Sequence, residues 1–595
     1  MKPIALGLVL AASFSLSALA AEPEGPAELI TQTEAVRIEI QDRLAATAGS
    51  SVEEQIALAE FYSEPARPLL WVDETGLTPR GKAVIAEVAK ADDYGLRAAD
   101  YKLPDTSGLN SANRPDKEWL ADAEIQTSRA VLGYAKDARG GRLDPQSLSK
   151  NLDPTLALPK PAEVLGSISF RSDPATYLRS FQPDHPQFEA LRKLLLEARG
   201  GNVAEAPKPD VVVIPDGPLL KLGVVHPQVA LLRARLDVSA PAGADENAFD
   251  QDVREAVRQF QLAQGGSPDG MVGSGTRRML NGQAAPRQVN GKEKIDLLLV
   301  NMERWRWLPH DLGAYYVTVN IPEFMLRIVE DDAQVHETRV VVGKTDKQTP
   351  VFSDEMEEIV FRPNWYVPNS IKTEEIAPYL YRGGGFFGGG WDTSILKRQN
   401  LHIRGTNGLD IDPDSIDWSR NDIRRYELYQ PPGPRNVLGL MKFRFPNTHD
   451  VYLHDTTQKH LFAKAVRAES HGCMRVQNPD QVAALLLGRD QGWNASKVAS
   501  AVNGADDNHI DLKTHIPVYI TYFTAVVDKD GSLKQFRDLY AHDRRMLAAL
   551  NGQSVPYGLP GSEEVATQTP AQRPAIRQGR QEDAFNAITR ALFDF

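Results

Sequence analysis

Cysteine, long apolar runs and clustered positive charge are all scarce in this sequence of 595 residues. Cys473 is the only cysteine, so no intramolecular disulfide can form. After residue 20, no segment reaches the ~20 apolar residues that a membrane-spanning helix needs. The net charge is −12 and no block of Lys and Arg stands out, which argues against nucleic acid as a partner. The composition, 42% hydrophobic and 25% charged, is that of a globular protein with several domains.

The N-terminal segment predicts export from the cytoplasm. Residues 1–20 begin with Met1-Lys2, continue as an apolar run and end in Ala18-Leu19-Ala20, a small-x-small cleavage pattern. The alternative is a signal anchor that stays in the membrane, but the run has no basic flank on its far side. We therefore expect a signal peptide that is cleaved after Ala20, and a periplasmic mature chain without a transmembrane segment.

The residues around the single cysteine predict a nucleophile. They read Ser470-His471-Gly472-Cys473-Met474-Arg475-Val476-Gln477-Asn478, and His454 ends a strand-like run nineteen positions before Cys473. A free thiol titrates near pKa ~8.5, so a neighbouring imidazole that takes its proton makes it a much better nucleophile. Gly472 allows a sharp turn that aims backbone N–H groups at an oxyanion, and each such donor is worth about 3–4 kcal/mol.

The residue types alone also allow two other interpretations of Cys473. A lone cysteine is often a small buried hydrophobic residue. His454, His471 and Cys473 could also supply three ligands to a zinc ion. His-x-Cys is not a usual zinc spacing and no fourth ligand stands out, so we expect neither a metal nor another cofactor.

The whole pattern, His454 followed by Ser-His-Gly-Cys-x-Arg-x-x-Asn, resembles the signature of the L,D-transpeptidases with a YkuD-type catalytic domain. The resemblance implies that Cys473 is the nucleophile and His454 its base, oriented by a backbone carbonyl. Tyr452 matches a tyrosine whose hydroxyl assists the oxyanion hole. The matching positions that shape the nucleophile turn are His471, Gly472, Arg475 and Asn478. Arg475 has two interpretations, a contact with a substrate carboxylate or a buried structural pair.

This resemblance implies an acyl transfer on peptidoglycan. Cys473 would form a thioester with a tetrapeptide stem and release D-Ala, and an amine of a second stem would complete a 3→3 cross-link. The expected partners are stem peptides and the sacculus, with carbapenem β-lactams as inhibitors that acylate Cys473. An L,D-carboxypeptidase and an enzyme that attaches lipoproteins to peptidoglycan would use the same Cys/His chemistry. A wall-binding scaffold without activity is the alternative from another class.

The first half of the chain reads as helical. Apolar residues recur at helical spacing in residues 82–90 and 121–136, and the stretch PLLWVDETGLTPRG resembles the N-terminal region of large YcbB-type members of that family. After a Gly- and Pro-rich linker at 201–218, three short amphipathic helices in residues 219–283 resemble a peptidoglycan-binding domain. Residues 292–309 predict a further helix, with Trp305 and Trp307 mainly as core anchors. The resemblance to that family implies that this helix returns to the scaffold.

From residue 314, apolar residues recur at every second position, the spacing that is typical of β-strands. Residues 315–321, 324–329, 338–342 and 518–527 predict strands. Residues 365–368 resemble the Trp-x-Val-Pro segment near the substrate groove of that family, which implies that Asn364 and Trp365 are candidate groove residues. By resemblance to the YcbB-type members, we expect residues 370–445 to be an irregular, mobile cap over the active site, with hinges at two triple-glycine runs, 383–385 and 388–390, and aromatic residues such as Trp391. The alternative is a surface excursion that takes no part in catalysis.

The expected fold class is multidomain α+β, with a β-rich YkuD-like catalytic domain, a mostly helical scaffold domain and a small three-helix binding domain. The expected boundaries are a signal peptide at 1–20, the scaffold at 28–200 with its returning helix at 290–312, the linker at 201–218, the binding domain at 219–283, the catalytic domain at 313–545 with a cap at about 370–445, and a low-complexity tail at 546–595 that ends in an amphipathic helix.

Overall fold

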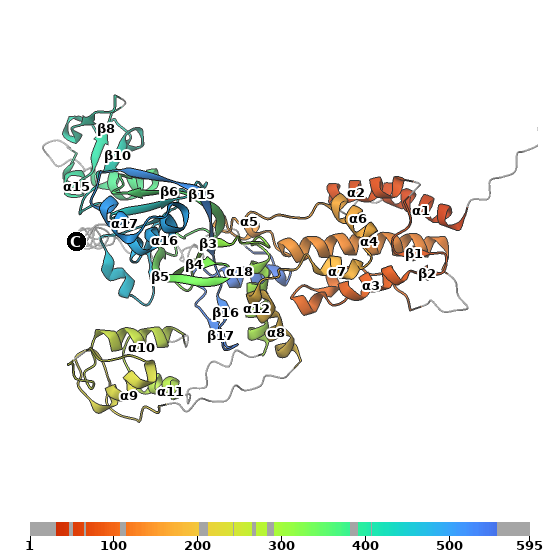
Figure 1. Ribbon diagram of the computed structural model, residues 1–595, viewed down its shortest axis with the longest axis horizontal. Helices are drawn as coiled ribbons and strands as arrows, with labels where there is room; N and C mark the ends of the chain where they lie inside the picture. Colours follow the sequence, from red (N-terminus) through yellow and green to blue (C-terminus); the bar gives the residue numbers. More distant parts are fainter. Residues whose placement is uncertain are drawn as a thin grey trace, which may run out of the picture.

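The computed structural model describes residues 31–46, 51–64, 67–107, 115–200, 212–241, 243–263, 269–281, 291–380, 391–405 and 407–555. The expected signal peptide, both triple-glycine runs, the first part of the linker and the expected C-terminal helix lie outside these residues. Figure 1 shows a helical N-terminal domain at one end of the molecule and a β-rich domain at the other. Within the described ranges, no helix combines the length and the apolar character that crossing a membrane requires.

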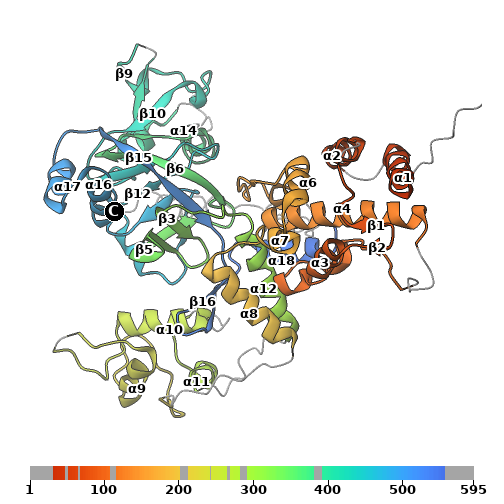
Figure 2. The same ribbon diagram turned by 45° about the vertical axis from the view of Figure 1, so that its right-hand side comes forward.

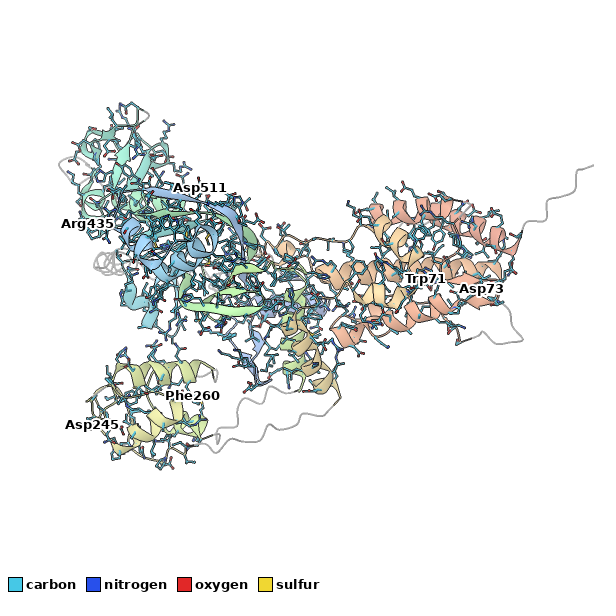
Figure 3. All side chains as sticks on the ribbon, in the orientation of Figure 1. Trp71, Asp73, Asp245, Phe260, Arg435 and Asp511 are labelled. Atoms are coloured by element: carbon cyan, nitrogen blue, oxygen red, sulfur yellow. The ribbon has the colours of Figure 1, made fainter. Side chains whose placement is uncertain are left out.

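The N-terminal domain is built around one long helix, α4 (Lys117–Gly140), whose first turn is capped by the Asp116 carboxylate. Its buried residues form a hydrophobic core with the other helices and with the loop that carries Trp71, labelled in Figure 3. Glu124 of α4 is buried and accepts backbone N–H bonds from residues 70–72, which fixes that loop. The other elements of this domain are α1 (Gln32–Ala46), α2 (Val52–Ser63), β1 (Val72–Asp73), β2 (Gly76–Leu77), α3 (Pro79–Val88), η1 (Ala91–Tyr94), η2 (Ala98–Asp100), α5 (Pro145–Leu148), α6 (Pro161–Phe170) and α7 (Pro174–Arg179).

A small helical unit is inserted between two helices that pack together. It consists of α9 (Pro227–Leu236), α10 (Gln251–Ala263) and α11 (Ser274–Leu280) around its own core, which includes Val229, Val253 and Val257. The flanking helices, α8 (Pro186–Arg199) and α12 (Gly291–Trp305), share a core of Phe188, Leu191, Leu195, Leu298 and Met302. Because α8 and α12 hold each other, the inserted unit branches from a fixed base.

The β-rich domain contains a nine-stranded sheet in the order β13-β5-β14-β12-β11-β6-β15-β3-β4, and an added β4–β5 pairing closes the sheet on itself. Its strands are β3 (Tyr315–Asn320), β4 (Met325–Glu330), β5 (Ala333–Gly343), β6 (Phe352–Phe361), β11 (Met441–Arg444), β12 (Leu453–His454), β13 (Ala468–Ser470), β14 (Met474–Val476) and β15 (Asn508–Thr521). The main core lies against this sheet, where α16 (Pro479–Gln491) and α17 (Ala495–Val502) also contribute apolar residues.

Two strand predictions need correction. The strand expected at 338–342 begins at Ala333, and the run expected at 518–527 is the end of β15 followed by a break and the short strand β16 (Ala525–Val527), which pairs with β17 (Leu533–Gln535). The break has a physical cause, because the Asn301 side chain of α12 accepts the backbone N–H groups of Thr524 and Ala525. Helix α18 (His542–Leu550) then packs near α12.

The segment expected to be irregular is a folded subdomain in its described part. It has a four-stranded sheet in the order β7-β10-β8-β9 and a hydrophobic core that includes Trp365 and Trp418. Its elements are β7 (Trp365–Tyr366), α13 (Asn369–Ile371), the π-helical turn η3 (Lys372–Ile376), α14 (Ala377–Leu380), α15 (Ser394–Arg398), β8 (His402–Arg404), β9 (Asp410–Ile411), η4 (Pro413–Ser415), η5 (Ile423–Arg425) and β10 (Glu427–Gln430). Its strands have two to four residues, too few for a periodic pattern to reveal them.

Figures 1 and 2 place this subdomain and the inserted three-helix unit on opposite sides of the β-rich domain. We call the subdomain, residues 365–438, the cap subdomain. The multidomain α+β prediction is confirmed by this architecture.

Candidate active site

Strand register brings the predicted residues to one face of the sheet. β12 lies between β14 and β11, with His454 paired to Arg475 on one side and to Lys442 on the other. We call Lys442, His454 and Arg475 the reactive row. Side chains alternate along a strand, so Tyr452, two residues before His454, and Cys473, two residues before Arg475, lie on the same face of the sheet as this row. The intervening residues Leu453, Phe443 and Met474 point to the core and are fully buried. The sheet therefore separates an apolar face from a reactive one.

The nucleophile turn between β13 and β14 is fixed by hydroxyl groups. Gly472 has φ +116°, a conformation that only glycine adopts without strain. The Ser470 hydroxyl accepts the Gly472 N–H at 3.2 Å and donates to the Cys473 carbonyl at 2.6 Å. The Thr349 hydroxyl donates to the Gly472 carbonyl at 2.7 Å and accepts the Gly343 N–H at 2.9 Å. Cys473 thus sits on a turn whose polar groups are bonded to their neighbours.

The Cys473 thiol is half-buried, and its Sγ lies 3.8 Å from the Asp450 carbonyl oxygen, to which it donates. Burial raises the pKa of Cys473. The backbone N–H and the hydroxyl of Tyr452, together with the cations Lys442 and Arg475, act in the opposite direction and lower this pKa. The site thus supplies both hydrogen-bond donors and positive charge to the thiolate.

His454 is buried, and its Nδ1 hydrogen-bonds to the carbonyl oxygen of Asp455. When Nδ1–H donates to this carbonyl, Nε2 is left as the proton acceptor. Burial is the largest of the effects that lower the pKa of His454 to about 3, and the positive charges of Arg475, Lys442 and Lys459 lower it further. The imidazole is therefore neutral at physiological pH, which is the form that can accept a proton.

Tyr452 connects the site to the cap subdomain. Burial raises the pKa of Tyr452 well above its ordinary value, and a hydrogen bond with the Trp365 side chain works against that rise. Trp365, one of the predicted groove residues, is buried in the cap core, while its neighbour Asn364 donates its backbone N–H to Asp507 at 3.1 Å. The Tyr452 hydroxyl thus remains a neutral donor at physiological pH.

Arg475 of the reactive row and Asn478 lie in different environments. Arg475 is buried and donates to the side-chain oxygen of Gln458; burial lowers its pKa to about 10. Asn478 is exposed and has φ +50°, immediately before the first residue of α16. Asparagine tolerates this left-handed conformation better than most residues, which gives the signature Asn a backbone role at the start of the helix.

His471 makes a contact that the sequence did not reveal. Its Nε2 lies 2.5 Å from Oε1 of Glu375, which belongs to the π-helical turn of the cap subdomain. A second ion pair, between Lys347 and Glu374, joins the same turn to the domain that carries Cys473. Two consecutive carboxylates therefore tie the cap subdomain to the nucleophile side of the sheet.

Four contributors to the site were missed by sequence reasoning: Thr349, Lys442, Glu375 and the backbone carbonyl of Asp450. None carries a local signal, because each lies 23 to 124 positions from Cys473 and reaches Cys473 or its neighbours Gly472 and His471 only in the folded chain. Among the described residues, no group of three or more His, Cys, Asp or Glu side chains is arranged to hold a metal ion.

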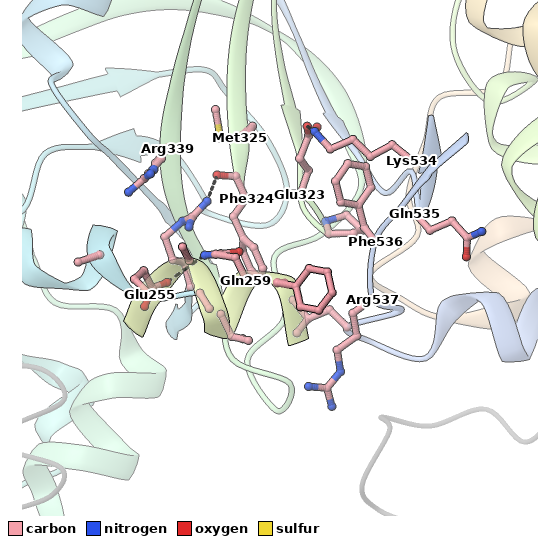
Figure 4. Close-up of a pocket in the computed structure, with 18 of the residues that line it drawn as sticks. Glu255, Gln259, Glu323, Phe324, Met325, Arg339, Lys534, Gln535, Phe536 and Arg537 are labelled. Carbon is pink, nitrogen blue, oxygen red and sulfur yellow. Dashed lines mark hydrogen bonds and ion pairs between the residues drawn. The ribbon is translucent and has the colours of Figure 1, made fainter. Parts of the chain in front are cut away.

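The large cavity in Figure 4 lies elsewhere, between the inserted helical unit and the β-rich domain. It has a volume of about 820 Å³ and is lined by α10 residues such as Glu255 and Phe260 and by Phe324, Arg467 and Phe536. Cys473, His454 and Tyr452 do not line it. This cavity is therefore separate from the candidate active site, which is defined by its residues.

Three protein families match the chain, each over one part of it. Residues 314–502 match the family described as L,D-transpeptidase catalytic domain. Residues 225–280 match "Putative peptidoglycan binding domain", and residues 56–195 match a scaffold domain. The β-rich domain with Cys473 thus matches the family of L,D-transpeptidase catalytic domains, and the inserted helical unit matches the peptidoglycan-binding family.

One curated protein, from Haemophilus influenzae, is 30% identical to this chain over 260 residues and is named "Putative L,D-transpeptidase". The match covers 43% of this chain and 50% of the relative, so the chain spans about half the length of that curated relative. Among solved structures, an L,D-transpeptidase from Xylanimonas cellulosilytica is 15% identical, with 51% of this chain and 98% of that chain covered and a TM-score of 0.20. Another, from Mycobacterium smegmatis, is 10% identical, with 35% and 58% covered and a TM-score of 0.17. At these TM-scores the structural neighbours add nothing to the argument.

Proposed function

We propose that this protein is a periplasmic L,D-transpeptidase that forms 3→3 cross-links in peptidoglycan through a thioester on Cys473. The observation that carries the proposal is the reactive face itself: the single thiol of the chain shares a sheet face with a neutral imidazole whose Nδ1 is bonded to a carbonyl. The matching catalytic and peptidoglycan-binding domains support the choice of substrate.

In the first half-reaction, Nε2 of His454 accepts the proton of Cys473, and the thiolate attacks the carbonyl carbon at the L-centre of the third stem residue. The Tyr452 hydroxyl is the proposed donor to the oxyanion, because the pKa of this hydroxyl is raised and it keeps its proton. The C–N bond then breaks, and D-Ala leaves with the proton that His454 returns. The product is a thioester on Cys473.

In the second half-reaction, the side-chain amine of the third residue of another stem attacks the thioester carbon. His454 accepts a proton from this amine, the C–S bond breaks and the thiol of Cys473 is restored. An amide bond between the two third residues remains, and no cofactor enters the balance.

The remaining predicted residues take roles that follow from their positions. Gly472 and His471 shape the nucleophile turn, and Trp365 and Asn364 form the wall on the side of the cap subdomain. Arg475 and Asn478 were predicted to bind substrate. The burial of Arg475 and the left-handed backbone of Asn478 support positioning roles instead.

The experiment that tests the proposal is mass spectrometry after residues 21–595 are incubated with a disaccharide-tetrapeptide. We expect a dimer that lacks one D-Ala, and no such dimer from the Cys473→Ala variant. Monomeric tripeptide alone would move the assignment to an L,D-carboxypeptidase with the same acyl-enzyme. If neither product forms, but a lipoprotein peptide is joined to the stem, the acceptor is a lipoprotein. Dimer formation by Cys473→Ala would refute the nucleophile.

A second measurement tests inhibition by β-lactams. We propose that carbapenems acylate Cys473, since they present an activated acyl carbon to the same thiolate. Intact mass should rise by the mass of one carbapenem in the wild type and stay constant in Cys473→Ala. Acylation of that variant would place the reactive group elsewhere.

The peptidoglycan-binding domain has its own test. Because α8 and α12 hold each other without it, residues 219–283 can be replaced by a short linker. We expect the shortened protein to lose most of its co-sedimentation with sacculi while its Cys473 still reacts with a carbapenem. Unchanged co-sedimentation would assign wall binding to another part of the chain.

A further inference from the structure

Lys442 stands next to the reactive pair, although no motif of the sequence marks it. On β11 it is the register partner of His454, and on the other side of His454 stands Arg475. Register partners lie on the same face of a sheet, so the imidazole is flanked by one cationic side chain on each neighbouring strand. The Nζ atom of Lys442 lies 4.1 Å from the centre of the Tyr452 ring, within the range of a cation–π contact.

The surroundings of Lys442 leave its charge without a carboxylate partner among the described residues. Lys442 is half-buried, and within the described part of the chain it has no ion pair with a carboxylate. Glu358, which lies on the adjacent strand β6, is paired with Arg444 at 3.1 Å and with His509 at 2.7 Å. Asp507 also influences Lys442, but Cys473 is the strongest of the charged groups that act on it.

We propose that Lys442 is an electrostatic positioning residue of the active site: its ammonium group, held over the Tyr452 ring, stabilises the Cys473 thiolate and keeps His454 uncharged. The catalytic value of this effect rests on the function proposed above. The effect of Lys442 on the Cys473 thiol itself exists whether or not a peptide is transferred.

The need for such a cation follows from the state of His454. An imidazole with a pKa of about 3 can pass a proton on, but it does not hold one at neutral pH, so it does not supply a lasting positive charge beside the thiolate. Burial also disfavours the thiolate. The charged groups that face Cys473 are Lys442 on β11 and Arg475 on β14, with Tyr452 and His454 as neutral neighbours. Of the two cations, Arg475 also interacts with the carboxylate of Glu469, and Lys442 has the larger lowering effect on the pKa of Cys473.

The single cysteine makes this proposal directly measurable. Iodoacetamide alkylates thiolates, and Cys473 is the only thiol of the chain, so the rate of the mass increase against pH reports the pKa of this one group. We expect Lys442→Gln to raise the apparent pKa of Cys473 by about one unit, which slows alkylation about tenfold at a fixed pH below that pKa. Lys442→Arg, which keeps the charge, should restore most of the rate.

A matched control uses the same strand. Arg444 lies two residues from Lys442 on β11, but it is paired with Glu358, so Arg444→Gln removes one positive charge without changing the group that faces the thiol. We expect its alkylation profile to follow the wild type. A melting curve for each variant establishes that it is folded, and Lys442→Met, which keeps the apolar stem, replaces Lys442→Gln if the latter unfolds.

The proposal is overturned if a folded Lys442→Gln or Lys442→Met variant has the alkylation profile of the wild type. It is also overturned if Arg444→Gln shifts the profile equally, because the effect would then be one of overall charge. The function proposed above can fail independently: a wild-type enzyme that makes no dimer from tetrapeptide can still show the shift in Cys473 reactivity.

Discussion

The hydroxyl of Thr349 offers a sharp test of how the nucleophile turn is held. This side chain is fully buried, donates to the Gly472 carbonyl at 2.7 Å and accepts the Gly343 N–H at 2.9 Å. Thr349→Val keeps the shape of the side chain but removes its hydroxyl. The Gly472 carbonyl and the Gly343 N–H then lose their hydrogen-bond partner in a buried position where water cannot replace it. Each buried polar group left unpaired costs about 1–3 kcal/mol, so we expect the loss of both partners to lower the unfolding free energy of the catalytic domain by about 2–6 kcal/mol.

Two comparisons separate the hydroxyl from the rest of the side chain. Thr349→Ser keeps both hydrogen bonds and loses one methyl group, a change that costs about 0.5–1.5 kcal/mol. Thr521→Val removes a buried hydroxyl that donates to the Val319 carbonyl at 3.1 Å, on strands away from the nucleophile turn. It should cost about 1 kcal/mol and leave the active site intact.

The assays are denaturant unfolding and the rate of carbapenem acylation of Cys473 under conditions where every variant is folded. We expect Thr349→Val to slow acylation at least tenfold, because the Gly472 carbonyl no longer anchors the turn, while Thr349→Ser and Thr521→Val stay close to the wild type. If Thr349→Val acylates at the wild-type rate although its stability has fallen, the hydroxyl holds the domain together but does not position Cys473.

Three further outcomes are expected. In Gly472→Ala the added Cβ meets no atom closer than 3.6 Å, so the change acts only through backbone strain at φ +116°, about 1–3 kcal/mol. We expect this variant to lose thioester formation. The control Gly531→Ala, also at positive φ and with open space around it, should keep the wild-type rate. Alkylation of Cys473 should rise about tenfold per pH unit between pH 7 and 8 without an inflection near 6.5, since the pKa of His454 is about 3; an inflection there would show a protonated imidazole in the site. Glu124→Ala should destabilise the N-terminal domain by about 3–5 kcal/mol in thermal unfolding because three buried N–H groups lose their acceptor, and an unchanged melting temperature would contradict this account.

The parts of the fold that the sequence predicted well are those with long periodic patterns. The helix α4, the three helices of the binding domain and the strands β3 and β4 repeat their apolar residues over several turns or pairs, so local spacing was enough to find them. The same spacing could not find the cap subdomain. Its strands are two to four residues long, and Trp365 and Trp418, which share its core, are more than fifty positions apart.

In the candidate active site, the features that the sequence predicted are those formed by residues close together along the chain. Cys473, Gly472 and His471 are adjacent, and the spacing to Tyr452 and His454 forms part of the same recognisable signature. Asn478 was also found by the signature, but its left-handed backbone before α16 became visible only in three dimensions. The same holds for Arg475, whose burial and bond to Gln458 depend on a segment seventeen residues away.

Local sequence was enough to predict that one thiol and one imidazole belong to an acyl-transfer signature, and that a helical region precedes a β-rich one. The surroundings of that pair became visible only in the folded chain. Strand register places Lys442 beside His454, and the loop between β5 and β6 places Thr349 against the nucleophile turn. Glu375 of the cap subdomain contacts His471. The physical reason is that charge and hydrogen bonding depend on distance in space, and sheet pairing joins residues that no local pattern connects.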